Sequence, residues 1–407
     1  MLSKNKNLLY LFLLILGLNG CEDKCFYYED QIIYEEVLQP LAEIKASFNV
    51  KPDFDISKPG NIYTYNQYLF VAEKFKGIHI LDNTNPSNPV KVKFIELFGN
   101  ENFVVVNNTL LADNGPDMLS IDISDLNNIS LKHRETDVNT ANIRGNQYVS
   151  GYNPIKKRVK VSCEGSRFES NRKMSDVSSA SGSGVSSGKG GSMAKFTVID
   201  NYLYIVNSSE LLPLDVSNPL LPLRKNTIGL MSNSVETVFP YKKFLYMGTS
   251  NGVLIYDCET SKEAPAYISN LRHVQGCDPV IVSDDVAFST VRGGTVCRTT
   301  NINQLNIYDV SNPALGQSMR SYNMIEPYGL GISNTLLFIC QGKNGLFVYD
   351  WDNSAKQINL RHSYPDIHAF DVIVNDKTLI VTADNGLFQF DISNPDNITY
   401  LSKLVNF

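Results

Sequence analysis

Short apolar runs that end on an aspartate recur along this chain, and each is followed by small polar residues or proline. The first run is Gly77–Asp82 and the last is Gly386–Asp391. The seven aspartates are Asp82, Asp122, Asp215, Asp257, Asp309, Asp350 and Asp391. Successive aspartates are 40, 93, 42, 52, 41 and 41 residues apart. A unit of about 40 residues therefore repeats, with one long interruption.

Within each unit the apolar positions follow a period of two, which indicates strands rather than helices. In the last unit the runs Asp371–Val374 and Leu379–Ala383 are separated by Asn375-Asp376, a pair that favours a tight hairpin. About 40 residues is the length of a four-stranded propeller blade. We therefore predict an all-β fold, a β-propeller of seven four-stranded blades. An eighth blade inside the interruption is the alternative.

The seven aspartates have a structural explanation. A carboxylate at the end of a strand accepts backbone N–H bonds from the next residues and closes the strand with an Asx turn. The competing hypothesis is a calcium loop, because residues 82–85 read Asp-Asn-Thr-Asn. That stretch lacks the central glycine and the distal glutamate of such a loop. Since catalysis needs a residue once and a turn needs it in every blade, we predict turn aspartates and no metal.

The long interruption lies between Asp122 and Asp215. Removing one normal unit leaves about fifty extra residues, and the stretch at about 164–192 is rich in glycine and serine. Such a composition buries too little apolar surface to offset the entropy of ordering it. We expect a flexible insertion, either a tolerated surface loop or an arm that contacts a partner.

The amino-terminal residues predict where the protein is located in the cell. Lys4 and Lys6 precede an apolar run, residues 8–18, that is too short to span a bilayer and is typical of a secretory signal. The run ends Leu-Asn-Gly-Cys at Cys21, which resembles a bacterial lipobox whose cysteine is acylated. We predict a signal peptide over 1–20 and a lipid-anchored tether over 21–58. A plain secretory signal with an incidental cysteine is the alternative.

The tether and the repeats that follow it complete the domain prediction. Pro40 interrupts the near-helical spacing of the tether, so we expect one short helical piece there. The propeller then occupies 59–407. Glu22-Asp23, directly after the cysteine, resembles the acidic tether of lipoproteins sent outward. We predict an outer-membrane lipoprotein on the cell surface or the periplasmic face, with the membrane as one partner through the anchor.

Composition and cysteine content narrow the classes further. The chain has 407 residues, and 43% of them are hydrophobic. Its net charge is −6, which argues against electrostatic binding to nucleic acid. Cys277 and Cys297 flank one predicted hairpin (280–291) on the same rim, so we predict a disulfide between them, with two unpaired thiols as the alternative. Pairing stays open for the remaining cysteines, Cys25, Cys163, Cys258 and Cys340. Without a CxxC pair, zinc and thioredoxin-like chemistry are not expected.

A candidate ligand site lies where inner strands and one long loop meet the propeller axis. The loop from Arg292 to Asn303 accounts for the spacing of 52 residues between two aspartates. Mixed arginine, acid and tyrosine side chains at a funnel are typical of a binding site, although rim salt bridges explain the same charges. The candidate ligand-binding residues are Asp278, Arg292, Arg298, Tyr328, His368 and Asp371.

Catalytic motifs are not evident in the sequence. Asp278, His368 and Asp371 could be arranged as the acid and base of a glycan hydrolase or lyase. The chain has five histidines and no HExxH, GxSxG or phosphate-binding glycine motif. We therefore name no catalytic residue and no cofactor.

Several linking stretches resemble the LVIVD-repeat family of bacterial lipoproteins. They are residues 77–89, 190–196, 276–280, 292–298, 303–305, 327–330 and 342–347. The chain departs from that pattern at Pro213, inside a predicted strand, and after Asp257 and Asp350. The resemblance implies a β-propeller. It implies no reaction, because the biochemical role of the family is largely undefined.

These observations favour a cell-envelope lipoprotein propeller that acts as a binding or protein-assembly module. Its expected partner is an envelope protein or an extracellular polymer. The alternatives are a propeller enzyme that acts on extracellular glycans, and a structural scaffold within an outer-membrane complex.

Overall fold

The computed structural model describes residues 26–52, 55–162, 189–273, 279–293, 302–333 and 335–404. Five candidate residues lie outside this part of the chain: Cys21, Cys277, Asp278, Cys297 and Arg298. The predicted lipidation, the predicted disulfide and two of the six ligand-site residues are therefore still predictions. Among the described residues, no helix is long and apolar enough to cross a membrane.

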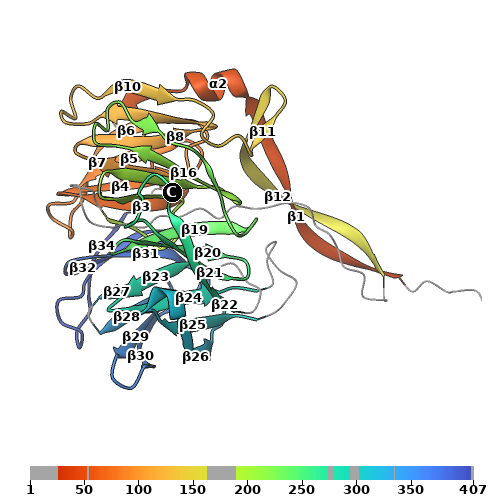
Figure 1. The fold of residues 1–407 in the computed structure, drawn as a ribbon, viewed down its shortest axis with the longest axis vertical. Helices are drawn as coiled ribbons and strands as arrows, with labels where there is room; N and C mark the ends of the chain where they lie inside the picture. Colours follow the sequence, from red (N-terminus) through yellow and green to blue (C-terminus); the bar gives the residue numbers. More distant parts are fainter. Residues whose placement is uncertain are drawn as a thin grey trace, which may run out of the picture. The chain divides into compact units, whose positions relative to one another are not determined.

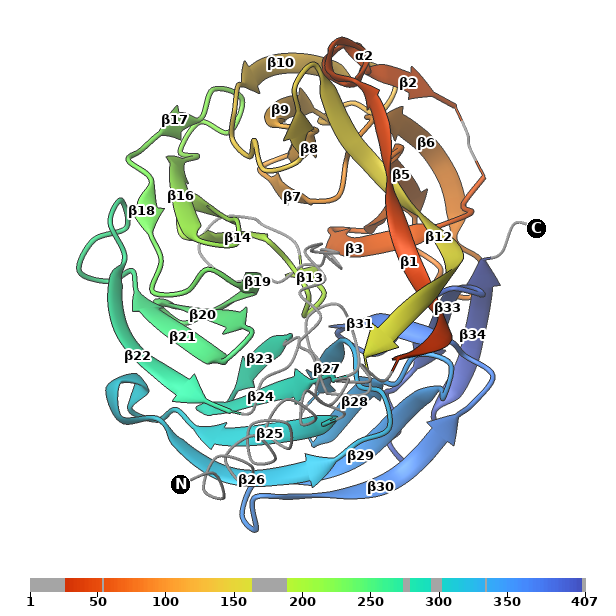
Figure 2. The same cartoon turned by 90° about the vertical axis from the view of Figure 1, so that its right-hand side faces the viewer.

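The chain divides into two compact units, a large one over 37–151 and 172–407 and a small one over 1–36 and 152–171. Seven antiparallel sheets, one per repeat, make up the large unit. Figure 2 shows them arranged around a common axis, and Figure 1 shows the same sheets in chain order from orange to blue. The predicted β-propeller of seven blades is confirmed, since the described part of the interruption adds no eighth four-stranded sheet.

The strand bounds follow the predicted cadence. The first three blades are β3 (Pro59–Tyr65), β4 (Tyr68–Glu73), β5 (Gly77–Asp82), β6 (Val90–Glu96); β7 (Phe103–Val106), β8 (Thr109–Asn114), β9 (Asp117–Asp122), β10 (Ser130–Glu135); and β14 (Phe196–Ile199), β15 (Tyr202–Val206), β16 (Glu210–Asp215), β17 (Leu223–Arg224), β18 (Ile228–Gly229). The fourth and fifth are β19 (Val235–Tyr241), β20 (Phe244–Thr249), β21 (Gly252–Asp257), β22 (Ala266–Arg272); and β23 (Val280–Ser283), β24 (Val286–Val291), β25 (Gln304–Asp309), β26 (Gln317–Asn323). The last two are β27 (Leu330–Ser333), β28 (Leu336–Cys340), β29 (Leu346–Asp352), β30 (Gln357–Tyr364); and β31 (Ala369–Asn375), β32 (Thr378–Ala383), β33 (Gly386–Asp391), β34 (Thr399–Leu404).

Hairpins between the first and second strands use the turn chemistry that the sequence predicts. Asn66, Asp200 and Asp376 adopt positive φ angles of 52° at these turns. Asn and Asp tolerate this left-handed conformation better than other residues that carry a Cβ, because their short polar side chains bond locally. The polar turn pairs therefore fix where each hairpin reverses.

The ring closes by side-chain contacts between the first and last blades. Ile62 and Val71 of blade 1 pack in one buried cluster with Ile373 and Ile380 of blade 7. Two reciprocal side-chain hydrogen bonds join Asn83 and Gln389, at 2.9 and 2.7 Å. Among the described strands, none of blade 7 pairs with a strand of blade 1. Closure therefore depends on packing rather than on a shared sheet.

Blade 3 departs from the repeat at Pro213. Its fourth strand is split into β17, which pairs with Leu214 and Asp215, and β18, which pairs with Glu210 and Leu211. Proline has no backbone N–H to offer an outer strand. Lys225 still donates its N–H to the Pro213 carbonyl at 3.0 Å, but residues 226 and 227 leave the ladder, which is the irregularity that the proline predicts.

The expected tether contains more strand than predicted. β1 (Phe26–Pro40) leads into the six-residue helix α2 (Leu41–Ala46), which begins directly after Pro40 as the helix-breaking effect of proline predicts. β2 (Asn49–Lys51) then pairs with the outer edge of β6. The first blade therefore includes residues before the predicted boundary at 59.

The interruption also contains strands that the sequence reading missed. β11 (Ile143–Arg144) pairs with β12 (Gln147–Ser162), and β12 pairs with β1 in a three-stranded sheet. Within the small unit, Lys156 Nζ lies 3.0 Å from Asp30 Oδ2, and the Arg158 guanidinium lies 5.7 Å from the centre of the Tyr28 ring. The paired strands thus carry complementary charge.

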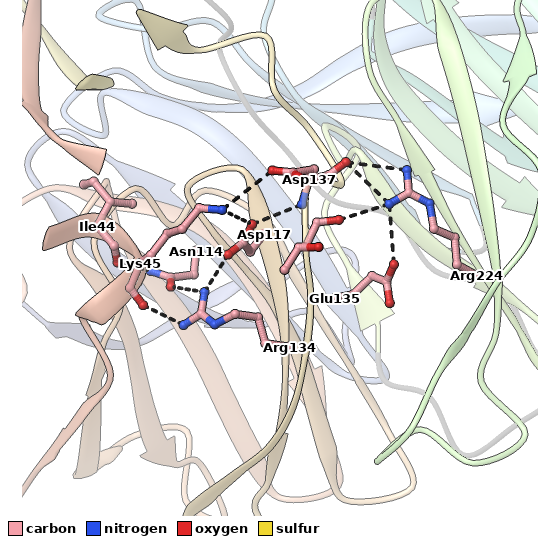
Figure 3. Close-up of polar contacts among 9 residues, drawn as sticks. Ile44, Lys45, Asn114, Asp117, Arg134, Glu135, Asp137 and Arg224 are labelled. Carbon is pink, nitrogen blue, oxygen red and sulfur yellow. Dashed lines mark hydrogen bonds and ion pairs between the residues drawn. The ribbon is translucent and has the colours of Figure 1, made fainter. Parts of the chain in front are cut away.

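A buried carboxylate holds α2 against blade 2 (Figure 3). Asp117 is fully buried and receives Arg134 Nη1 at 2.9 Å and Lys45 Nζ at 3.0 Å. Arg134 also donates to the Lys45 carbonyl at 2.7 Å, which satisfies an orphan C=O at the helix end. Asn114 completes the cluster by donating to the Ile44 carbonyl at 2.9 Å.

Arg224 extends this polar network from blade 3 to blade 2 (Figure 3). Its guanidinium donates to the Thr136 carbonyl at 3.0 Å and to Glu135 Oε1 at 3.4 Å. Asp137 has a positive φ of 54° and donates its backbone N–H to Asp117 at 3.1 Å. The start of the interruption is therefore anchored to both blades.

Candidate functional site

The two ends of the propeller differ in character. In an antiparallel four-stranded blade, the connections from strand one to two and from three to four lie at one end. The connections from two to three and from blade to blade lie at the other. We call the first end the turn face and the second the insertion face. The connection after β10 (136–195) and the connection after β24 (292–303) both belong to the insertion face.

The turn face is uniform because its aspartates make the predicted Asx turns. In six blades the aspartate Oδ1 accepts the backbone N–H two residues further on, at 2.7–3.0 Å, and these residues are Asp82, Asp122, Asp215, Asp257, Asp309 and Asp391. Hydrogen bonds from Thr84 hold the pKa of Asp82 below its usual value. Among the described residues, no group of three His, Cys, Asp or Glu side chains could hold a metal ion.

The prediction for Asp350 is wrong. β29 continues for two residues beyond it, so Asp352 makes the turn and accepts the Ser354 N–H at 2.8 Å. Asp350 instead accepts from Arg361 Nε at 2.6 Å. Trp351, buried against Phe288, extends the strand and displaces the turn.

An axial segment, residues 189–195, is the main unexpected feature of the insertion face. Its first two residues form β13 (Lys189–Gly190), which pairs with the inner edge of β3. Figure 2 shows β13 near the middle of the ring. The Ala194 carbonyl then accepts the Val238 N–H of blade 4 at 2.6 Å. The predicted flexible insertion at 164–192 is wrong for its last four residues, since 189 and 190 pair with β3 and 191 and 192 are buried. The rest of that prediction, 164–188, lies outside the described residues.

Ser192 joins the axial segment to blades 6 and 7. Its hydroxyl donates to Asp371 Oδ1 at 3.1 Å and accepts the Leu330 N–H at 2.9 Å. Gly191 lies so close to Asp371 that an added Cβ would be 1.9 Å from Oδ2. Only a glycine fits beside the carboxylate.

Asp371 itself is an almost fully buried carboxyl group, 5% exposed. Its Oδ2 has no hydrogen-bond partner in the described part of the chain. Burial raises the pKa of Asp371 to about 7, although bonds from Val372 and Ser192 oppose the rise. The buried Asp371 carboxyl group therefore has a pKa near neutral pH.

Arg292 and Tyr328 form a second contact on the insertion face. The Arg292 guanidinium carbon lies 3.7 Å from the centre of the Tyr328 ring, which is a cation–π geometry. Arg292 is 5% exposed, and the Tyr328 hydroxyl donates to Glu326 at 3.1 Å. The Tyr328 ring also packs edge-on against Phe370, with centroids 5.1 Å apart. The tyrosine thus connects Arg292 to the strand that carries Asp371.

His368 contacts a different carboxylate. Its Nδ1 is 2.8 Å from Asp384 Oδ1, and its side chain is 37% exposed. Asp371 bonds to Ser192 rather than to His368. The predicted open funnel is therefore wrong for Arg292 and Asp371, which are buried, and the described geometry does not pair Asp371 with His368 as an acid and base. Tyr328 is half-buried and, with His368, remains reachable from solvent.

Sequence reasoning missed Gly191 and Ser192 as site residues. Their stretch, residues 190–194, reads Gly-Gly-Ser-Met-Ala, and its first three residues fall within the predicted flexible insertion, although residues 190–196 also carry the family resemblance. The useful signal was the apolar Met193-Ala194 step into β14, which marks the residues before it as part of the repeat.

Fold and repeats together define a seven-bladed β-propeller module. The LVIVD repeat model matches residues 56–95 and 190–227, which correspond to blade 1 and to the axial segment with blade 3. These two segments carry LVIVD repeats, and there the predicted resemblance is confirmed. No curated protein matches it.

Solved structures share the fold at low identity. A functionally unknown protein from Desulfotomaculum acetoxidans is 10% identical, with a TM-score of 0.54, over 84% of this chain and 96% of that one. A Lactobacillus plantarum protein is 11% identical, with a TM-score of 0.53, over 86% and 96%. Saccharomyces cerevisiae Sqt1 is 9% identical, with a TM-score of 0.52, over 88% and 87%. These similarities show the fold alone.

Proposed function

We propose that this protein is a lipid-anchored module of the cell envelope that binds an envelope protein or an extracellular polymer through its insertion face. The observation that carries the proposal is the asymmetry of the two propeller ends. Six near-identical Asx turns occupy the turn face. The two longest connections between described strands of neighbouring sequence both start and end at the insertion face. Binding residues concentrate on variable loops that a rigid scaffold holds in place.

The polar groups available on the insertion face suit recognition better than catalysis. His368 is paired with Asp384 and partly exposed, and Tyr328 is half-buried over Arg292. Asp371, the carboxyl group that a glycan enzyme would need, is covered by Gly191 and Ser192. The alternative of a glycan hydrolase therefore has the weaker structural support.

The lipid anchor is supported by the sequence around Cys21, with Lys4 and Lys6 before an apolar run. We expect the full-length protein in the outer-membrane fraction and labelled by fatty acid, because acylation anchors the mature chain. The Cys21→Ser variant should be unlabelled and leave that fraction. Full-length protein captured from gently cross-linked envelopes should retain a partner that is depleted from the Cys21→Ser capture. Equal labelling and equal fractionation of the two proteins would contradict the anchor, and recovery of the lipoprotein alone would contradict the assembly role.

A further inference from the structure

A polar cavity opens between blades 2 and 3 on the insertion face. Its volume is about 250 Å³, and one wall is the stretch 137–141 where the chain leaves blade 2. The opposite wall is the connection 207–210 of blade 3, with Arg224 and Thr227 at the side. All of these residues belong to the large unit.

Two departures from the repeat meet at this cavity. Between blades 1 and 2 only residues 97–102 intervene, and between blades 6 and 7 only 365–368, whereas 136–195 intervene between blades 2 and 3. The short connection between neighbouring blades is thus replaced, between blades 2 and 3, by a much longer stretch of chain. Pro213 interrupts the outer strand of blade 3, and residues 226 and 227 leave the ladder between β17 and β18. The opening is therefore a specific feature of this junction.

The cavity has an aliphatic floor and a polar rim. Val138, Ile205 and Leu212 are buried and supply the floor. The rim carries amide, hydroxyl and carboxylate groups from Asn139, Thr140, Asn207, Ser208, Glu210 and Thr227. Such a mixture offers many hydrogen-bond donors and acceptors beside a small apolar surface.

One carboxylate in the rim is held in place before any ligand arrives. Asn207 Oδ1 accepts the backbone N–H groups of Ser209 and Glu210 at 3.0 and 2.8 Å, and its Nδ2 donates to Glu210 Oε2 at 3.0 Å. Arg224 meanwhile holds the facing wall through the Thr136 carbonyl. A preorganised site of this kind loses less free energy in ordering its groups on binding.

We infer that this cavity binds a single sugar ring, as the terminal or side-chain residue of an extracellular glycan. A pyranose presents an apolar C–H face to an aliphatic floor and a ring of hydroxyls to amides, hydroxyls and a carboxylate. The volume is slightly below the roughly 300–1,000 Å³ of ordinary ligand pockets, so one ring fits better than an extended chain. The inference rests on the proposed function, because it gives the insertion face a polymer ligand.

The test is saturation-transfer NMR on the full-length chain with glucose, galactose, mannose and N-acetylglucosamine as separate probes. We expect at least one sugar to bind saturably with a Kd of roughly 1 mM, which is about −4 kcal/mol. Thr227→Trp places an indole in the opening, outside the strand ladder, and should abolish the signal. Thr399→Trp, at an exposed position of β34, is the matched control and should bind as the parent does. Glu210→Gln should weaken binding several-fold.

Three results would overturn the inference: no saturable signal from any of the four sugars, equal binding by the two tryptophan variants, or binding of free amino acids in place of sugars. Because the capture experiment reports a partner independently, a captured protein without sugar binding would remove this inference and leave the proposed function in place.

Discussion

Replacing Gly191 with alanine should destabilise the propeller by about 3 kcal/mol. An added Cβ would lie 1.9 Å from Asp371 Oδ2 and 2.7 Å from its Cγ, and Asp371 is buried with little room to move. Overpacking of this kind typically costs ~1–3 kcal/mol, and loss of the Ser192 hydrogen bond adds about 1 kcal/mol. The measurement is the free energy of unfolding from urea titration followed by circular dichroism.

Gly229→Ala is the matched control for this substitution. An added Cβ at Gly229 meets nothing within 4 Å, so its effect should stay within about 0.5 kcal/mol. In an Asp371→Ala background the Gly191→Ala substitution should cost much less, because the clashing carboxyl group is gone. Equal costs in the two backgrounds would show that Asp371 does not limit the axial segment.

The second large effect is on the pH dependence of stability. The pKa of Asp371 is raised to about 7 in the folded protein, against 3.8 for the unperturbed group. Between these values the unfolded chain has lost the proton and the folded chain retains it, so unfolding is increasingly favoured as pH rises from about 4 to 7. Each unit of difference corresponds to about 1.4 kcal/mol. Asp371→Asn does not titrate and should lose this component.

The expected result is a gap that widens with pH. Relative to the parent, the Asp371→Asn protein should gain a few kcal/mol of unfolding free energy between pH 4 and 7. Asp113 is half-buried, and desolvation raises its pKa to about 6, so both proteins should retain a smaller fall in the same window. Urea titrations at matched pH values measure both curves. Parallel curves would place the titration of Asp371 outside this window.

The sequence predicted the parts of the fold that repeat. Six aspartates make the expected Asx turns, and Asn66 and Asp376 reverse the hairpins as turn residues should. These features depend on residues that are adjacent in the sequence, and the same short sequence pattern recurs in each blade. Asp350 failed for a local reason too, because β29 runs on to Asp352.

The candidate site was harder to predict because its contacts are long-range. Ser192 and Asp371 are 179 positions apart, and nothing in a Gly-Ser stretch says which part of it enters the ring axis. Arg292 and Tyr328 are both predicted ligand-binding residues, but the sequence does not show that they stack on each other, which buries the arginine. Sequence pattern placed these residues on strands and loops, whereas side-chain packing decided which of them face solvent.

Photo-crosslinking from the two propeller faces in intact envelopes tests whether the protein binds its partner through the insertion face. A photoreactive amino acid replaces Lys343, which is exposed in the connection between β28 and β29 on the insertion face. In a second protein it replaces Lys377, which is exposed in the hairpin before β32 on the turn face. We expect a discrete adduct from position 343 and none from position 377. An adduct from position 377 alone, or from neither position, would contradict binding through the insertion face.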